Sequence, residues 1–182
     1  MKNKGIVKID EVGRIVIPKN IRNMLELKDK LVEVFVENDR IIIQKFAPLY
    51  LNSEMVKSLC KKIELLTGYP CIAGDYEKII YASASSLSFL EGKQISMALK
   101  SKLGEQGVVI IKENAIIEND DFKCKGLCLT PINNSVDGVI GFFGLISLDE
   151  NDFNDKDIYS LKIAKELFSS VINRENGRWF YA

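Results

Sequence analysis

The first ~45 residues alternate short apolar runs with single turn residues, a pattern typical of a small β-rich unit. Gly13 supplies the positive φ that a sharp turn demands, and Pro18 suits the start of a helix, where its missing N–H costs little. Asn38-Asp39 has the composition of a two-residue hairpin turn. In order, the pattern predicts strands at 5–9 and 15–17, a helix at 18–25 with Ile21, Met24 and Leu25 inward, and strands at 31–36 and 40–45.

This first unit is too small to enclose a sizeable core by itself. A unit of about 45 residues is near the size at which a lone hydrophobic core is marginal. The alternation nevertheless places Val32, Val34 and Val36 on one face of their strand, and the unit is rich in isoleucine. We therefore expect these side chains to close a core shared with a second chain, which makes the unit a dimer.

From residue 52 onward the pattern changes to helices with apolar stripes and to longer strands. The first helix, capped by Asn52 or Ser53 and ended by Gly68, carries one such stripe: Met55, Val56, Leu59, Ile63 and Leu66. After it we expect strands at 70–73 and 78–83, a helix at 88–103, a strand at 108–112, a polar loop at 113–121, strands at 124–132 and 139–148, and a final helix from about Asn154 to 174. The order α-β-β-α-β-β-β-α predicts a central antiparallel sheet.

The pattern divides the chain into two domains. We place them at 1–47 and 54–176, with a short connector at 48–53, where Pro48 cannot continue a ladder, and an aromatic C-terminal tail at 177–182. The final helix has a wide apolar stripe, which suits either burial on the sheet or a subunit interface: Ile158, Leu161, Ala164, Phe168, Val171 and Ile172, with Ile163 and Leu167 beside it.

The charge is unevenly distributed along the chain. The total is balanced at 25 basic and 25 acidic residues, but residues 1–25 hold six cations against Asp10 and Glu11. The basic end is therefore the part suited to nucleic acid. No apolar run approaches the roughly 20 residues needed to span a bilayer, and there is no apolar secretory segment at the start. We expect a cytoplasmic protein without a membrane partner.

The absence of histidine limits the chemistry of this chain. It excludes a histidine-based triad, a Cys–His nucleophile pair and a mixed Cys/His zinc site, so we expect no enzyme, no metal and no cofactor. The spacing of Cys124 and Cys128 is neither that of a redox pair nor that of a zinc knuckle. We interpret the cysteines as reduced, partly buried thiols, and a redox-sensing pair is the alternative. Gly141-Phe142-Phe143-Gly144 lies in an apolar strand and is expected to permit close packing, not to hold a phosphate.

The run Asp10-Glu11-Val12-Gly13-Arg14-Ile15-Val16-Ile17-Pro18-Lys19-Asn20-Ile21-Arg22 closely resembles the D-x-x-G-R-[IV]-x-[IL]-P-K-x-[IL]-R signature of the AbrB-like, swapped-hairpin transcription regulators. The resemblance covers about residues 1–46. It implies a dimeric DNA-binding fold, a swapped-hairpin β-barrel whose hairpins exchange between two chains.

In that family the arginine of the turn and the arginines of the short helix contact DNA, and they correspond here to Arg14 and Arg22. The candidate DNA contacts are Lys4, Lys8, Arg14, Lys19, Arg22 and Asn23. A solvated basic face is the alternative, and Arg14 could instead lock the hairpin. Two departures from the family pattern remove positive charge. The segment before Asp10 has one cation and is one residue shorter than in relatives, which puts the direction of Lys8 in doubt. Asn23 stands where relatives have arginine.

The order of elements in residues 52–176 looks like a GAF domain, a sensor fold with a central antiparallel sheet. This implies an α/β sensor domain that binds an unknown small molecule or sets the oligomeric state. Candidate pocket residues lie near the first hairpin, although ordinary surface is an equal interpretation: Tyr76, Tyr81, Ser83 and Ser85.

Together the two parts resemble regulators of gene expression in the developing spore of endospore-forming bacteria. The sequence therefore predicts an α+β protein that binds double-stranded, AT-rich DNA as a homodimer or homotetramer. An antitoxin-like protein-interaction module is the second hypothesis. The third is a cysteine-dependent enzyme that uses Cys71, Cys124 and Cys128 in one pocket.

Overall fold

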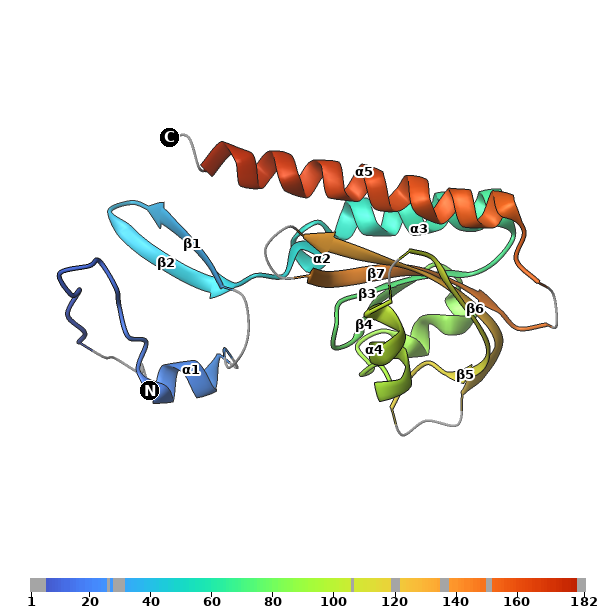
Figure 1. Ribbon diagram of the computed structural model, residues 1–182, viewed down its shortest axis with the longest axis horizontal. Helices are drawn as coiled ribbons and strands as arrows, with labels where there is room; N and C mark the ends of the chain where they lie inside the picture. The colour runs from blue at the N-terminus through green and yellow to red at the C-terminus, as the bar shows by residue number, and fades with distance from the viewer. Residues whose placement is uncertain are drawn as a thin grey trace. The chain divides into compact units, whose positions relative to one another are not determined.

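Two units make up the chain in the computed structural model: Met1–Phe46, here called the head, and Ala47–Ala182, called the body (Figure 1). The structure describes residues 6–25, 27, 32–105, 107–118, 122–134, 138–149 and 152–179. Both antiparallel pairing and helices occur, which confirms a mixed α+β architecture. Within the described ranges, no helix combines the length and apolarity that crossing a membrane requires.

The head contains one short helix and one hairpin. Helix α1 spans Lys19–Met24 after Pro18, and strands β1 (Val32–Glu37) and β2 (Arg40–Lys45) pair antiparallel. Asn38 and Asp39 have φ angles of 46° and 61°, which is the left-handed backbone of a two-residue hairpin turn. The hairpin and its turn are confirmed as predicted.

One face of this hairpin is apolar and exposed. Val34 pairs with Ile43 and Val36 pairs with Ile41, and directly opposed residues share a face. Within the single chain Val34 is 60% exposed, Val36 70% and Ile41 56%. On the other face, Gln44 Nε2 donates to Glu33 Oε2 at 2.8 Å. The alternation predicted for the valines is confirmed, but nothing in this chain's described residues covers their face.

Three expectations for the head differ from the structure. Residues 6–10 and 14–18 form no strand within the single chain, and Met24 and Leu25 are exposed, not inward. Ile21 is half-buried as expected. An extended segment needs a neighbouring strand to satisfy its N–H and C=O groups, and the described residues of the head do not pair with these segments as a strand.

The body is built around a five-stranded antiparallel sheet with the strand order β4-β3-β7-β6-β5. The strands are β3 (Cys71–Gly74), β4 (Ile79–Ala82), β5 (Val109–Ala115), β6 (Lys123–Asn134) and β7 (Gly138–Ser147). The helices are α2 (Pro48–Leu51), α3 (Ser53–Thr67), the 3₁₀ helix η1 (Ser85–Leu90), α4 (Met97–Leu103) and α5 (Asp155–Trp179). The central antiparallel sheet is confirmed.

Helices cover the sheet from both sides. Helices α3 and α5 lie side by side on one face, while η1 and α4 lie on the other (Figure 1). Successive residues of β7 point to opposite faces of the sheet. The ring of Phe143 packs edge-on against Phe168 of α5, with 5.8 Å between the ring centroids. Phe142 belongs to the core on the other face, under η1 and α4. A sheet buried on both faces explains why β7 is a continuous apolar run.

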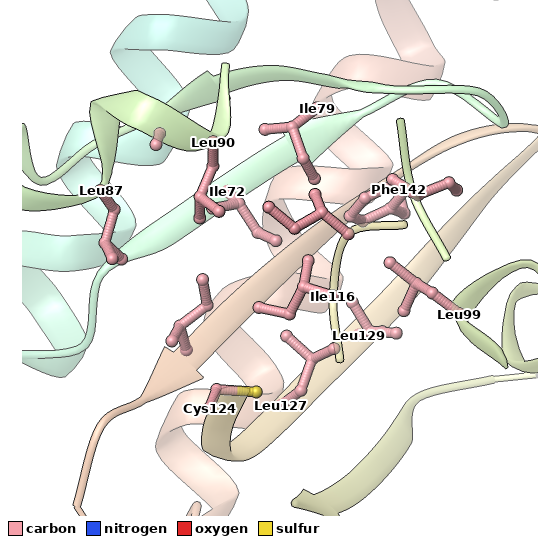
Figure 2. Packing of buried hydrophobic residues seen from close by; sticks show 14 of the residues in the cluster. Ile72, Ile79, Leu87, Leu90, Leu99, Ile116, Cys124, Leu127, Leu129 and Phe142 are labelled. Carbon is pink, nitrogen blue, oxygen red and sulfur yellow. The ribbon is translucent and has the colours of Figure 1, made fainter. Parts of the chain in front are cut away.

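The core between the sheet and η1 and α4 is closely packed. Ile72, Leu90, Leu99, Leu129 and Phe142 converge there with no exposed surface (Figure 2). A Cβ added at Gly144 would come within 2.7 Å of Leu129 Cδ2, and one at Gly141 within 2.5 Å of Leu49 Cδ1. The expectation that these glycines permit close packing is therefore confirmed.

Three segments of the body differ from their predicted structure. The single helix expected at 88–103 is broken. Gly92 adopts φ +79°, and Gln94 and Ile95 form isolated β-bridges with Lys78 and Ile117. Helix α4 therefore begins only after its cap at Ser96. The expected polar loop 113–121 starts with an extension of β5 and contains buried Ile116 and Ile117. Within the expected connector 48–53, Pro48–Leu51 is helical and Leu49 is 1% exposed.

Helix α5 begins at a reciprocal cap. The side chain of Asn154 accepts from the N–H of Asp157 at 3.2 Å, and the carboxylate of Asp157 accepts from the N–H of Asn154 at 2.9 Å. The predicted stripe is buried in the body at Leu161, Ala164, Phe168 and Ile172. Ile163 and Leu167, which flank it, are exposed at 59% and 49%. Residues 180–182 of the predicted tail lie outside the described part of the chain.

Candidate nucleic-acid interface

The turn Asp10–Gly13 is closed by backbone and side-chain hydrogen bonds. The N–H of Gly13 donates to the carbonyl of Asp10 at 3.0 Å, and the N–H of Asp10 donates to the carbonyl of Arg14 at 3.1 Å. Gly13 has φ +85°, which an L side chain rarely adopts. The turn predicted at this point is present, and it holds Arg14 directly after its last residue.

The carboxylate of Asp10 organises the inside of this turn. Its Oδ1 accepts from the N–H of Val12 at 3.0 Å and from the N–H of Arg14 at 2.8 Å, which is an Asx turn. Its Oδ2 accepts from Nε of Arg14 at 2.8 Å. The backbone N–H of Arg14, followed by its side chain, lowers the pKa of Asp10 below the ordinary value of 3.8, since both donors favour the ionised form.

Helix α1 presents the other cations. Lys19, Arg22 and Asn23 are exposed, and Lys19 and Arg22 share a helical face because they are three residues apart. Arg22 stands in the last turn of the helix, where a cation complements the helix dipole. Lys8 is exposed in the non-strand segment before the turn, and Lys4 lies outside the described residues.

Sequence reasoning missed one member of this group. Asp10 was counted as an opposing charge, although it is the residue that contacts Arg14. Its position two residues before Val12 and four before Arg14 is the spacing of an Asx turn, and this signal was present in the sequence.

The four residues predicted to line a ligand pocket do not converge. Tyr76 is 42% exposed in the β3–β4 loop, with its hydroxyl 3.4 Å from the carbonyl of Lys100 of α4. Ser83 is engaged with the backbone of β3, since its Oγ accepts from the N–H of Cys71 at 2.8 Å. Ser85 is exposed at the start of η1.

The fourth candidate, Tyr81, points to a different neighbourhood. Burial raises the pKa of its hydroxyl, and the nearby thiol of Cys60 on α3 raises it further. Tyr81 thus faces α3, whereas the Tyr76 hydroxyl lies near α4 on the other side of the sheet. The structure does not form one pocket from these four side chains.

The cysteine side chains are buried, and they do not gather at one place. Cys71 lies beside Cys60, and burial followed by this contact raises its thiol pKa well above 9.0. Burial raises the pKa of Cys128 to about 12, with the Asp157 carboxylate adding to the effect. Cys124 instead belongs to the core on the η1 and α4 side. The three thiols of the enzyme hypothesis therefore share no pocket.

The predicted redox alternative for Cys124 and Cys128 is wrong for an intramolecular disulfide. Both lie on β6, four residues apart. At about 3.3 Å per residue their Cα atoms are roughly 13 Å apart, beyond the roughly 7 Å limit for a disulfide. Among the described residues there is also no group of three or more acidic or cysteine side chains placed to hold a metal ion.

The head matches a known family. Residues 6–48 match the family described as antidote-toxin recognition MazE, bacterial antitoxin. The same part is similar to the transition state regulatory protein AbrB of Bacillus subtilis (strain 168), at 44% identity over 50 residues, which cover 26% of this chain and 52% of that protein.

A longer similarity extends into the body. The chain is 31% identical over 113 residues to stage V sporulation protein T of Bacillus subtilis (strain 168), which covers 60% of this chain and 64% of that protein. This chain thus spans less than two thirds of the length of these relatives.

Among solved structures, a domain of a sensor histidine kinase protein from Sinorhizobium meliloti 1021 has a TM-score of 0.48 at 11% identity, covering 70% of this chain and 94% of that chain. Similarity at this level supports no functional argument. The sequence comparisons support the following conclusion: this chain is similar to stage V sporulation protein T, and its head is similar to the transition state regulatory protein AbrB and matches the MazE family over residues 6–48.

Proposed function

We propose that this chain is a DNA-binding transcription regulator of sporulation genes, and that the head binds double-stranded DNA as a swapped-hairpin dimer. The observation that carries the proposal is that one small domain exposes cations both directly after a turn, at Arg14, and on a short helix, at Lys19 and Arg22. This domain is similar to the transition state regulatory protein AbrB. A turn and a short helix with exposed cations suit a phosphate backbone.

The dimer is supported by the surface that one head leaves uncovered. Val34, Val36 and Ile41 of the hairpin, together with Ile6 and Val16 of the irregular segments, are more than half exposed. Apolar area of this kind is driven out of water at about 25 cal/mol per Å². Exchange of hairpins with a second chain would cover these side chains and would give residues 6–10 and 14–18 the strand partners they lack in one chain.

The body is proposed to set the oligomeric state or to respond to a small molecule. Tyr159, Ile163 and Leu167 recur every four residues along α5 and are 63%, 59% and 49% exposed. This stripe suits contact with a second body, which would join two head dimers in a tetramer. Two linked head dimers would bind DNA more tightly than one, because the second contact becomes intramolecular.

Titration of a labelled AT-rich duplex by fluorescence anisotropy, with the full chain at several salt concentrations, tests the proposal. With about four phosphates neutralised per dimer, the slope of log affinity against log salt is expected near −4. Arg22→Ala should weaken binding by about tenfold and flatten the slope by about 2 per dimer. Lys93→Ala, which removes an exposed cation of the body, is the matched control and should leave both quantities unchanged.

A protein-interaction role is the second candidate, because residues 6–48 match a family of bacterial antitoxins. In that case the exposed apolar surface of the head would bind a different protein. Salt-independent or absent binding to every duplex, together with a stoichiometric protein partner recovered on the full chain, would replace the DNA-binding proposal with this one.

A further inference from the structure

Arg14 is an exposed cation of the head whose side chain is held by a neighbouring carboxylate. Its side chain is 77% exposed, yet its Nε donates to Asp10 Oδ2 at 2.8 Å. A free arginine side chain samples many rotamers and loses that freedom when it binds. A side chain held at Nε has fewer directions open to it, so it can present a defined edge to a partner.

The carboxylate that holds Arg14 is itself fixed. Oδ1 of Asp10 accepts two backbone N–H groups, from Val12 and Arg14, and this orients the carboxylate plane before Oδ2 meets the guanidinium. Exposed ion pairs between two long, mobile side chains contribute little. Here one partner is short and already bound to the backbone at Oδ1, so the usual entropic cost falls mainly on Arg14.

The contact leaves the functional end of Arg14 available. Nε belongs to one edge of the planar guanidinium, and the two terminal amino groups form another edge, directed away from the hydrogen on Nε. That second edge is the one that forms paired hydrogen bonds with a base edge or with phosphate oxygens.

We propose that Asp10 is a positioning residue that holds the Arg14 guanidinium toward DNA and thereby supplies sequence discrimination. This inference rests on the proposed function of the head. It assigns separate roles to the cations: Arg14 carries discrimination between sequences, while Lys19 and Arg22 on α1 carry charge and therefore salt-dependent affinity.

The substitution Asp10→Asn separates positioning from simple charge. Asparagine keeps an oxygen for the N–H groups of Val12 and Arg14, so the turn persists, but its amide presents donors to Nε of Arg14 in place of an acceptor. Removal of a negative charge near DNA should by itself tighten binding to every sequence. Loss of positioning should instead weaken binding to a preferred sequence. The charge effect and the positioning effect therefore change the affinity for that sequence in opposite directions.

The test compares two duplexes: the sequence enriched by the wild-type full chain from a random pool, and its scrambled version. Asp10→Asn is expected to reduce the affinity ratio between them by about tenfold, with binding to the scrambled duplex unchanged or tighter. The salt slope should stay at the wild-type value because Arg14 retains its charge. Arg14→Lys should likewise lose discrimination and keep the slope. In an Arg14→Ala background, Asp10→Asn should leave the affinity ratio between the two duplexes unchanged, even if binding to both becomes tighter.

Gly13→Ala is the control for a broken turn, because an L side chain at φ +85° strains the backbone although no atom lies within 4 Å of the added Cβ. It should weaken binding to both duplexes. If the wild-type chain discriminates and Asp10→Asn leaves the affinity ratio unchanged, whether or not both affinities shift together, the positioning role is overturned. A wild-type chain that binds neither duplex overturns the proposed function itself.

Discussion

The head and the body are both rich in branched apolar residues, yet one encloses a core and the other does not. In the body Phe142, Phe143 and Phe168 have no exposed surface. Among the described residues of the head, Leu27 alone is buried, while Val36 is 70% exposed. The difference comes from layers: helices cover both faces of the body's sheet, whereas a lone hairpin has no cover for its apolar face.

The causes of the pKa shifts follow burial, which differs between the two units. In the body, burial is the main cause of the raised pKa values of Cys71, Cys128, Tyr69 and Tyr81. In the head, hydrogen bonds lower the pKa of Asp10 on an exposed turn. Desolvation thus dominates at these buried groups, whereas a hydrogen bond dominates at exposed ones, both at Asp10 of the head and at Glu54 of the body, where Lys57 lowers the carboxyl pKa. The comparison supports the proposal that the head completes its core with a second chain, whereas the body encloses a core within one chain.

The largest expected effect is on the body's own core. Phe168→Ala removes the ring that packs on Phe143 and should lower the free energy of unfolding by about 3–5 kcal/mol. Thermal unfolding at two protein concentrations checks this, and the loss should be the same at both. Glu166→Ala, two residues away and exposed, should change stability by less than about 0.5 kcal/mol. A loss that appeared only at low concentration would mean that the body's core also depends on a second chain.

A charge on the apolar face of the head should act on association instead. Val34→Asp is expected to weaken self-association of the full chain by on the order of 2 kcal/mol, because a carboxylate would be buried without a partner. Sedimentation equilibrium measures the change. Glu37→Gln on the same strand, an exposed polar position, is the control and should leave association unchanged. If Val34→Asp associates as wild type does, this face is solvated and the head is complete in one chain.

The smallest expected effect is a pH dependence confined to the body. Folding raises the thiol pKa of Cys128 from 9.0 to about 12, so this group stabilises the fold fully below pH 9 and progressively less up to about pH 12. Between pH 9 and pH 10 its share of the loss is on the order of 1 kcal/mol. Urea unfolding between pH 8 and 11 measures it, and Cys128→Ala should show a shallower decline. Equal declines in the two proteins would mean that other groups, such as the tyrosines, account for the dependence.

Local signals in the sequence were sufficient wherever a few neighbouring residues decide the backbone. The turn at Asn38-Asp39, the end of α3 at Gly68 with φ +78°, and the cap of α5 at Asn154 are all as predicted. Each depends on one residue's φ preference or on one side chain that reaches its own backbone. The same reasoning located the turn before Arg14, although it overlooked the role of Asp10.

Predictions failed where distant pairing overrides local preference. Residues 93–95 fit a helical pattern, but Gln94 pairs with Lys78 and Ile95 with Ile117, so the chain is extended there. Ile116 and Ile117 fall within the predicted polar loop, although both are buried in the structure. The candidate ligand residues near the first hairpin are close in sequence, yet strand alternation sends Tyr81 toward α3 while the loop carries Tyr76 toward α4.

Local patterns in the sequence were enough to predict most elements of the body in their order, the turn and helix that carry Arg14 and Arg22, and the apolar alternation of the head's hairpin. These follow from backbone preferences and side-chain periodicity, which act over a few residues. Which apolar faces are covered and which thiols are inaccessible depends on the tertiary structure. Burial depends on where the folded chain brings distant segments together, which a local pattern does not specify.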